Sequence, residues 1–140
     1  MPYLSSDLPF PAPGPDTAAF WAHIDAGRLM FQVCEDCGHV VHPPLPVCPA
    51  CQSRRRGWRP APPTGRVFSY TVAHYPSHPA VETQLPYNIV LVEFPVLPGV
   101  RLVSNLIDTP PETLAVGLEV APVFEPAGDG RTVVRFRRCG

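Results

Sequence analysis

Four cysteines lie in two closely spaced pairs, Cys34-x-x-Cys37 and Cys48-x-x-Cys51. Two intervening residues let a tight turn direct both sulfurs of a pair at one ion, and two such turns complete a tetrahedron of thiolate ligands. Because four protein ligands leave no position for water or substrate, the pattern predicts a structural metal ion and not a Lewis acid. We expect metal binding to supply most of the folding free energy of this segment, on the order of 10 kcal/mol or more.

Zinc is the metal that this pattern favours, and iron is the alternative that the ligands leave open. The turn sequences CEDCG and CPAC also suit the iron site of rubredoxins, because four thiolates do not by themselves distinguish the two metals. The gap of ten residues between the pairs is shorter than in rubredoxins, which favours zinc. A redox dithiol and two local disulfides are the remaining alternatives. We expect His39 and His42 to be exposed loop residues and Cys139 to be a free thiol.

The composition argues against several classes of protein. The formal net charge of −1 is unlike the basic excess of most nucleic-acid-binding domains. All 11 cationic residues are arginine, so the chain offers neither a Schiff-base lysine nor a phosphate-loop lysine. No run approaches the roughly 20 apolar residues that span a bilayer, and the first residues lack the basic start and apolar core of a signal peptide. We therefore expect a cytoplasmic protein without a membrane partner, where reduced thiols favour a metal over disulfides.

The order of the expected elements gives a mainly β fold in five segments. Residues 1–15 form a proline-rich arm, 16–27 a short helix, 28–58 the four-cysteine zinc ribbon, 59–65 a proline-stiffened linker and 66–140 a β domain. The β domain contains five runs of strand-forming residues, at 66–75, 87–94, 100–107, 118–125 and 131–138. A five-stranded barrel with its longer insertion between the third and fourth strands is the OB-fold arrangement.

Alternation along the first and last runs predicts which side chains face the core. On the first run these are Phe68, Tyr70 and Val72, and on the last they are Val134 and Phe136. The second run is apolar on both faces, so we expect its outer face to be covered by the ribbon, by the helix or by another protein.

Aromatic and arginine side chains near the ribbon are the candidate ligand- or partner-binding residues. Two aromatic residues lie near one face of the expected helix, where they either pack on the chain's own fold or contact a partner or ligand. Arginines also surround a tryptophan after the second cysteine pair. Guanidinium groups match phosphate in a bidentate fashion, although clustered arginines also form simple solvated faces. The candidates are Phe20, Trp21, Arg54, Arg55, Arg56 and Trp58.

The order of these segments resembles that of the DUF35 family of zinc-ribbon and OB-fold proteins. The resemblance runs from about Phe20 to Arg137 and is carried by the stretches FWAHIDAGRLMFQVCEDCGHVVHPPLPVCPAC, GRVFSYTV, PYNIVLVEF, GVRLVSNLI and VGLEVAPVFEP. It implies an accessory subunit of acyl-CoA enzymes, with acyl-CoA as ligand. The implied partners are thiolase-like or lipid-transfer-type thiolases or aldolases, and hotdog-fold enoyl-CoA hydratases. The resemblance gives the four paired cysteines a metal-binding role and carries over no catalytic residue.

We therefore expect a non-catalytic subunit that binds or positions acyl-CoA thioesters in lipid, sterol side-chain or polyketide metabolism. The sequence contains no nucleophile elbow, no glycine-rich phosphate loop and no histidine-based catalytic metal motif, so we expect no independent catalytic site. Two alternatives stay open. One is a single-stranded nucleic-acid-binding protein, since zinc ribbons and OB barrels both serve that purpose. The other is a rubredoxin-like electron carrier.

Overall fold

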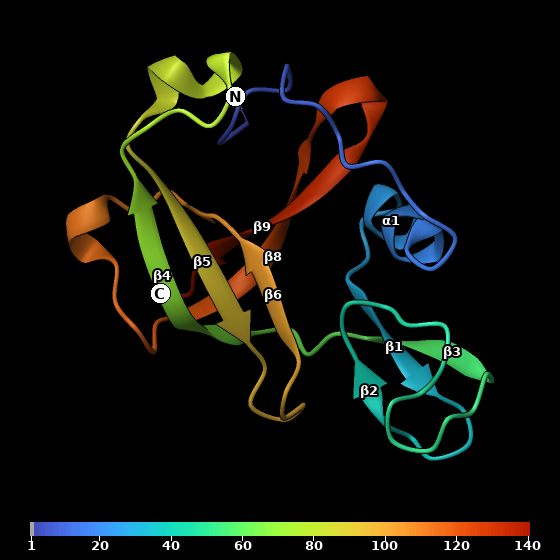
Figure 1. The fold of residues 1–140 in the computed structure, drawn as a ribbon. Helices are drawn as coiled ribbons and strands as arrows, with labels where there is room; N and C mark the ends of the chain where they lie inside the picture. The colour runs from blue at the N-terminus through green and yellow to red at the C-terminus, as the bar shows by residue number, and fades with distance from the viewer. Residues whose placement is uncertain (1) are drawn as a thin grey trace.

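The computed structural model describes residues 2–140, which form one α-helix and two β-sheets (Figure 1). The helix is α1 (Ala18–Asp25). The smaller sheet has the order β2-β1-β3 and consists of β1 (Met30–Cys34), β2 (Val40–Val41) and β3 (Arg56–Pro60). The larger sheet has the order β6-β5-β4-β8-β9-β7 and consists of β4 (Gly65–Ala73), β5 (Tyr87–Glu93), β6 (Arg101–Ser104), β7 (Leu106–Ile107), β8 (Glu119–Pro126) and β9 (Thr132–Arg138). Three short 3₁₀ turns are η1 (Pro79–Gln84), η2 (Pro111–Thr113) and η3 (Gly128–Gly130). Within residues 2–140, no helix has the length and apolar character needed to cross a bilayer.

Helix α1 ends in a turn that requires a glycine. Gly27 has a φ of 76°, in the left-handed region, and the Arg28 N–H donates to the His23 carbonyl at 2.9 Å. This is the hydrogen-bond pattern of a Schellman motif, in which the residue after the cap reverses the chain. The reversal leads the chain from α1 directly into β1.

The ribbon is a small sheet that presents both cysteine pairs from turns. β1 pairs with β2 on one side and with β3 on the other, and Cys34 at the end of β1 lies opposite Arg56. After each first cysteine the chain forms a tight turn, closed by the Gly38 N–H to Cys34 carbonyl bond at 2.9 Å and the Gln52 N–H to Cys48 carbonyl bond at 2.8 Å. The expected mainly β fold with a short helix and a four-cysteine ribbon is confirmed.

The β domain has six strands because the third expected strand is interrupted at one residue. The run 100–107 divides into β6 and β7 on either side of Asn105, whose carbonyl accepts the Phe136 N–H at 3.0 Å. β6 pairs with β5, whereas β7 runs parallel to β9, so one stretch of chain forms both edges of the sheet. The expected five-stranded barrel is thus an OB-like sheet whose hydrogen-bonded ladder is not closed.

A β-bulge in β4 changes the face on which its side chains lie. The register with β5 shifts between Val67 and Ser69. Val67 is buried, whereas Phe68 and Tyr70 are 38% and 41% exposed. The prediction that Phe68 faces the core is wrong, because Phe68 is the extra residue of the bulge and lies on the outer face beside Arg101. Beyond the bulge, Tyr70 lies opposite the buried Val90 although it is itself exposed at 41%, and Val72 packs against the core as predicted. On β9, Val134 and Phe136 are buried as predicted.

One hydrophobic core joins the ribbon and the helix to the β domain. Phe31 of β1 is fully buried, and its ring centroid lies 5.2 Å from that of Phe94. The Phe94 ring lies in turn 6.4 Å from that of Phe136 on β9. Phe20 and Ile24 of α1 belong to the same buried cluster. Because these side chains pack on one another, the ribbon and α1 have fixed positions relative to the large sheet.

The N-terminal arm, residues 2–15, lies along the β domain. The Tyr3 N–H donates to Glu125 Oε1 at 2.9 Å, and the Tyr3 hydroxyl accepts from N and Nδ2 of Asn88, each at 2.9 Å. The Ser5 N–H donates to Gln84 Oε1 at 2.9 Å. From this anchor the arm passes over the β8–β9 hairpin to α1 (Figure 1). These contacts hold the side chains of the arm above β6 and β9.

Candidate metal centre and apolar cavity

The sulfur atoms of the two cysteine pairs form a compact cluster. The ligand atoms of Cys34, Cys37, Cys48 and Cys51 all lie within 4.8 Å of one another. The Cys34 and Cys51 sulfurs are 3.6 Å apart, and so are the Cys37 and Cys48 sulfurs. A tetrahedral zinc ion with Zn–S bonds of about 2.3 Å separates its sulfurs by about 3.8 Å. The four side chains therefore fit a single ion of this size.

Backbone N–H groups in the turns favour thiolates at this cluster. The N–H groups of Cys37 and Asp36 hydrogen-bond to the Cys34 sulfur and lower the pKa of Cys34 to about 6. The Ser53 N–H acts in the same direction on Cys51, but the nearby Cys34 and Cys37 sulfurs and burial outweigh it and raise the pKa of Cys51 to about 12. Four sulfurs this close do not all carry a negative charge unless a cation lies among them. The cluster thus has the electrostatics of a metal site.

The predicted arginines lie on the ribbon and not at a cavity. Arg55 pairs with Asp36 and Glu35, and its Nη2 lies 3.6 Å from Glu35 Oε2. Arg56 donates to the Leu45 carbonyl at 2.7 Å and lies 3.6 Å from an Asp16 carboxylate oxygen.

Arg54 is exposed, and the half-buried Trp58 packs with its ring centroid 5.3 Å from that of His23. Phosphate binding by Arg54, Arg55 and Arg56 stays a prediction.

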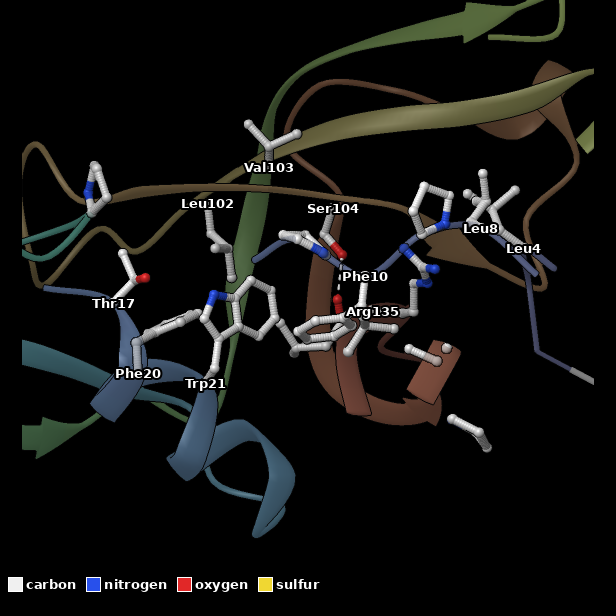
Figure 2. A pocket seen from close by; sticks show the side chains of 18 of the residues that line it. Leu4, Leu8, Phe10, Thr17, Phe20, Trp21, Leu102, Val103, Ser104 and Arg135 are labelled. Atoms are coloured by element: carbon white, nitrogen blue, oxygen red, sulfur yellow. Dashed lines mark hydrogen bonds between the residues drawn. The ribbon is translucent and has the colours of Figure 1, made fainter. Parts of the chain in front are cut away.

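The other two predicted residues, Phe20 and Trp21, line a cavity of about 550 Å³. The cavity lies between the N-terminal arm, α1, the loop after β2, β6 and β9. Figure 2 shows the Trp21 indole between Phe20 and Phe10, with ring centroids 5.4 Å and 4.8 Å away, and Leu102 of β6 above it. On the sheet side, the Ser104 hydroxyl donates to the Val134 carbonyl at 2.7 Å, the dashed line in Figure 2. The sequence analysis assigned the arm no role, because its prolines carry no signal for packing.

His42 lies in the wall of this cavity, and the expectation of an exposed loop residue is wrong. Its ring centroid is 4.9 Å from that of Phe20 and 5.4 Å from that of Phe31. Burial against these rings lowers the pKa of His42 to about 4, so the imidazole is neutral at pH 7. Its Nδ1 is buried and has no hydrogen-bond partner within residues 2–140. His42 therefore packs as an aromatic ring and does not act as a metal ligand.

A buried polar network that the sequence analysis missed lies beside the cavity. Arg135 Nε lies 3.5 Å from Glu125 Oε1, and Arg135 Nη1 donates to the Asn105 side-chain oxygen. The Asn105 amide donates to the Asn88 carbonyl, and Asn88 Nδ2 and Oδ1 bond the carbonyl and N–H of Leu106, each at 2.7 Å. The two asparagines within otherwise apolar runs were the available signal, because buried polar groups need partners.

Models of two protein domains match most of the chain. Residues 21–55 match the "ChsH2, rubredoxin-like zinc ribbon domain", and residues 58–125 match the "ChsH2, C-terminal OB-fold domain". A DUF35 domain-containing scaffold protein of Methanothermobacter thermautotrophicus is 32% identical over 113 residues, covering 78% of this chain and 81% of the relative. This chain belongs to the DUF35 family.

Two longer relatives carry names of hydratase subunits. The probable enoyl-CoA hydratase alpha subunit of Thermomonospora curvata is 39% identical over 131 residues, which cover 85% of this chain and 40% of the relative. The 3-oxo-4,17-pregnadiene-20-carboxyl-CoA hydratase alpha subunit of Mycobacterium tuberculosis is 32% identical over 114 residues, covering 81% of this chain and 35% of the relative. The DUF35 chain thus spans well under half the length of these two proteins.

A solved structure named "Ltp2-ChsH2(DUF35) aldolase" contains a chain with nearly the same fold. The TM-score is 0.84 at 38% identity, and the match covers 92% of this chain and 98% of that one. A DUF35 protein of unknown function from Sulfolobus solfataricus has a TM-score of 0.65 at 18% identity, which supports the fold alone.

Proposed function

We propose that this chain is a non-catalytic accessory subunit of an acyl-CoA enzyme, which binds or positions acyl-CoA thioesters for a catalytic partner. The observation that carries the proposal is the likeness to a chain of the Ltp2-ChsH2(DUF35) aldolase, since it extends over 92% of this chain and 98% of that one. The name of that structure joins a DUF35 protein to an aldolase. The absence of catalytic motifs from the sequence supports the non-catalytic part of the proposal.

The partner that we propose is an aldolase subunit of the lipid-transfer or thiolase-like type. The printed name of the solved structure supports an aldolase. A hotdog-fold hydratase is the alternative partner, and the names of the two longer relatives support it. The names of the two longer relatives specify CoA thioesters, which supports an acyl-CoA thioester as the substrate.

We propose zinc as the ion held by Cys34, Cys37, Cys48 and Cys51. The sulfur separations of 3.6 Å suit its bond lengths, and four thiolates fill its usual coordination shell. Bound there, the ion would brace the two turns of the ribbon and supply no Lewis-acid chemistry. Colourless purified protein with one zinc per chain is the expected result, whereas a visible absorption band would assign iron.

An exposed apolar sheet face supports contact with the catalytic partner. Phe68 on β4 and Val103 on β6 are 38% and 67% exposed, and Ile89 and Leu91 lie on the same face of β5. α1 contacts β9 and β1, and the ribbon lies beside α1, away from β4 and β5, so neither covers this face (Figure 1). Since the ribbon and the helix leave the outer face of β5 uncovered, this face supports the third predicted cover, another protein.

Co-expression with a candidate aldolase tests the proposal. The two chains should co-elute in size exclusion, and the aldolase should lose activity towards its acyl-CoA substrate when this chain is left out. This chain alone should turn over no acyl-CoA. Failure to co-elute with any aldolase or hydratase, or turnover by this chain alone, would contradict the proposal.

A further inference from the structure

We infer that the cavity beneath the N-terminal arm is a binding site for the uncharged, apolar part of a small molecule, and that this part is the acyl group of a thioester. The choice of an acyl group rests on the proposed function. The site itself rests only on the geometry of residues 2–140.

The size and lining of the cavity are those of a ligand pocket. Its volume of about 550 Å³ falls within the range of about 300–1,000 Å³ of small-molecule sites. Aliphatic and aromatic side chains from the arm, α1 and β6 form most of the wall: Leu4, Leu8, Phe10, Phe20, Trp21 and Leu102. Such a wall attracts a hydrocarbon group through the burial of apolar surface.

The charges at the cavity select against an anion. Arg101 lines the rim, but its guanidinium carbon lies 3.9 Å from the Phe68 ring centroid, on the outer face of the sheet. Arg135 also lines the cavity, and its Nε has no hydrogen-bond partner within residues 2–140, but the Glu125 carboxylate 3.5 Å away already balances its charge. A carboxylate or phosphate bound inside would be a buried charge without a free cation, which is costly. The phosphates of a CoA ester must therefore stay outside, with only the acyl group inside.

Residues 4–11 of the arm line one side of the cavity and are called its roof here. Hydrogen bonds within the chain hold this roof in place. Before the roof, Tyr3 is bonded to Asn88 and Glu125; after it, the Gly14 N–H donates to the Thr17 hydroxyl at 2.9 Å. Between these anchors the arm lies so close to Gly128 that an added Cβ would meet the Leu8 carbonyl at 3.0 Å. Because the site is preformed within one chain, binding should not require the catalytic partner.

The two tryptophans make a direct test possible. Trp21 lines the cavity, whereas Trp58 lies on the ribbon and outside the lining. Trp58→Phe leaves Trp21 as the reporter, and Trp21→Phe leaves Trp58. Each variant is titrated with decanoyl-CoA, decanoate and CoA, and tryptophan emission is recorded.

Decanoyl-CoA should change the emission of Trp21 in a saturable manner and leave Trp58 unchanged. Decanoate should bind at least tenfold more weakly, because its carboxylate would be buried, and CoA should produce no change. Equal binding of decanoate, the same change with CoA, or a response of Trp58 in place of Trp21 would overturn the assignment.

A charge in the roof should abolish binding without unfolding the chain. Leu8→Asp, made in the Trp58→Phe background, should raise the Kd for decanoyl-CoA at least tenfold, and the exposed control Val116→Asp should leave it unchanged. Metal content and Tm establish that each variant is folded, and Leu8→Gln replaces Leu8→Asp if the latter does not fold. An unchanged Kd in the folded roof variant would overturn the assignment.

Co-elution separates this inference from the proposed function. If the chain co-elutes with an aldolase but binds no decanoyl-CoA, the acyl site is refuted and the accessory role is not. The same holds if the emission of Trp21 changes only when the aldolase is added. A chain that binds decanoyl-CoA at Trp21 but co-elutes with no acyl-CoA enzyme refutes the accessory role alone.

Discussion

Cys34 is the best-buried ligand of the sulfur cluster, and its sulfur accepts two backbone N–H groups. Cys34→Ser removes one of the four thiolate ligands, so the remaining three should bind the metal ion more weakly. We expect the purified variant to contain much less than one metal ion per chain and its Tm to fall by about 10 °C or more. Elemental analysis and thermal unfolding measure both quantities.

The exposed Cys139 offers the matched control for this variant. Cys139→Ser should keep the metal content and Tm of the unaltered chain, because Cys139 lies outside the cluster. Full metal occupancy and an unchanged Tm in Cys34→Ser would show that the cluster is not the metal site.

His42 makes the stability of the fold depend on pH in one direction. Its pKa is about 4 in the folded chain against an ordinary value of 6.5, so the unfolded chain binds the proton more readily. The stabilisation is therefore complete above pH 6.5 and is lost as pH falls towards 4. Between pH 7 and pH 5, we expect His42 to reduce the free energy of unfolding by about 2 kcal/mol.

Comparison with His42→Leu isolates this contribution from protonation of the cysteines, which both proteins share. Denaturant unfolding at pH 7 and pH 5 should show a smaller loss in the variant. Equal losses in the two proteins would mean that His42 is not buried in the neutral form.

Within the elements, Gly65 at the start of β4 leaves no room for a side chain. A Cβ there would lie 2.7 Å from the Glu93 carbonyl oxygen and 2.8 Å from Val92 Cγ1. Gly65→Ala should therefore displace β4 from β5 and cost about 1–3 kcal/mol of stability, measured by denaturant unfolding. In Gly14→Ala the added Cβ meets only Thr17 Oγ1, at 4.0 Å, so this control should change stability little. A Gly65→Ala chain as stable as the control would refute the close packing.

The sequence predicted which elements form, but for several of them it did not predict which side chains are buried. Cysteine spacing and strand-forming runs predicted the ribbon and the β domain, because both signals are local. The bulge after Val67 and the interruption at Asn105 depend on pairing between distant strands, so no local pattern reveals them. The burial of His42 requires Phe20 and Phe31 to meet in space. The packing of the arm likewise depends on Asn88, 85 residues beyond Tyr3.

At the scale of the whole molecule, the exposed face of β4, β5 and β6 is where we expect the catalytic partner to bind. Phe68→Asp places a charge at this face without touching the core, since Phe68 is 38% exposed. The variant should keep its Tm and lose most of its co-elution with the partner, because desolvating an unpaired charge in an interface is costly. Size exclusion of the mixed proteins measures this.

Val96 is a matched control outside this face. It is 72% exposed in the turn after β5, and Val96→Asp should leave co-elution unchanged. Equal co-elution of Phe68→Asp and Val96→Asp would move the partner to another surface.

The contact between the rings of Phe31 and Phe94 links two parts of the chain that have different sources of stability. Since the strand that carries Phe31 ends at Cys34, removing a bound ion with a chelator should loosen the packing of Phe31 in the core of the β domain. Amide hydrogens deep in β5 and β9 should then exchange faster, although they lie far from any sulfur. Loss of the ion should accordingly expose the whole chain, and not merely its ribbon, to proteolysis.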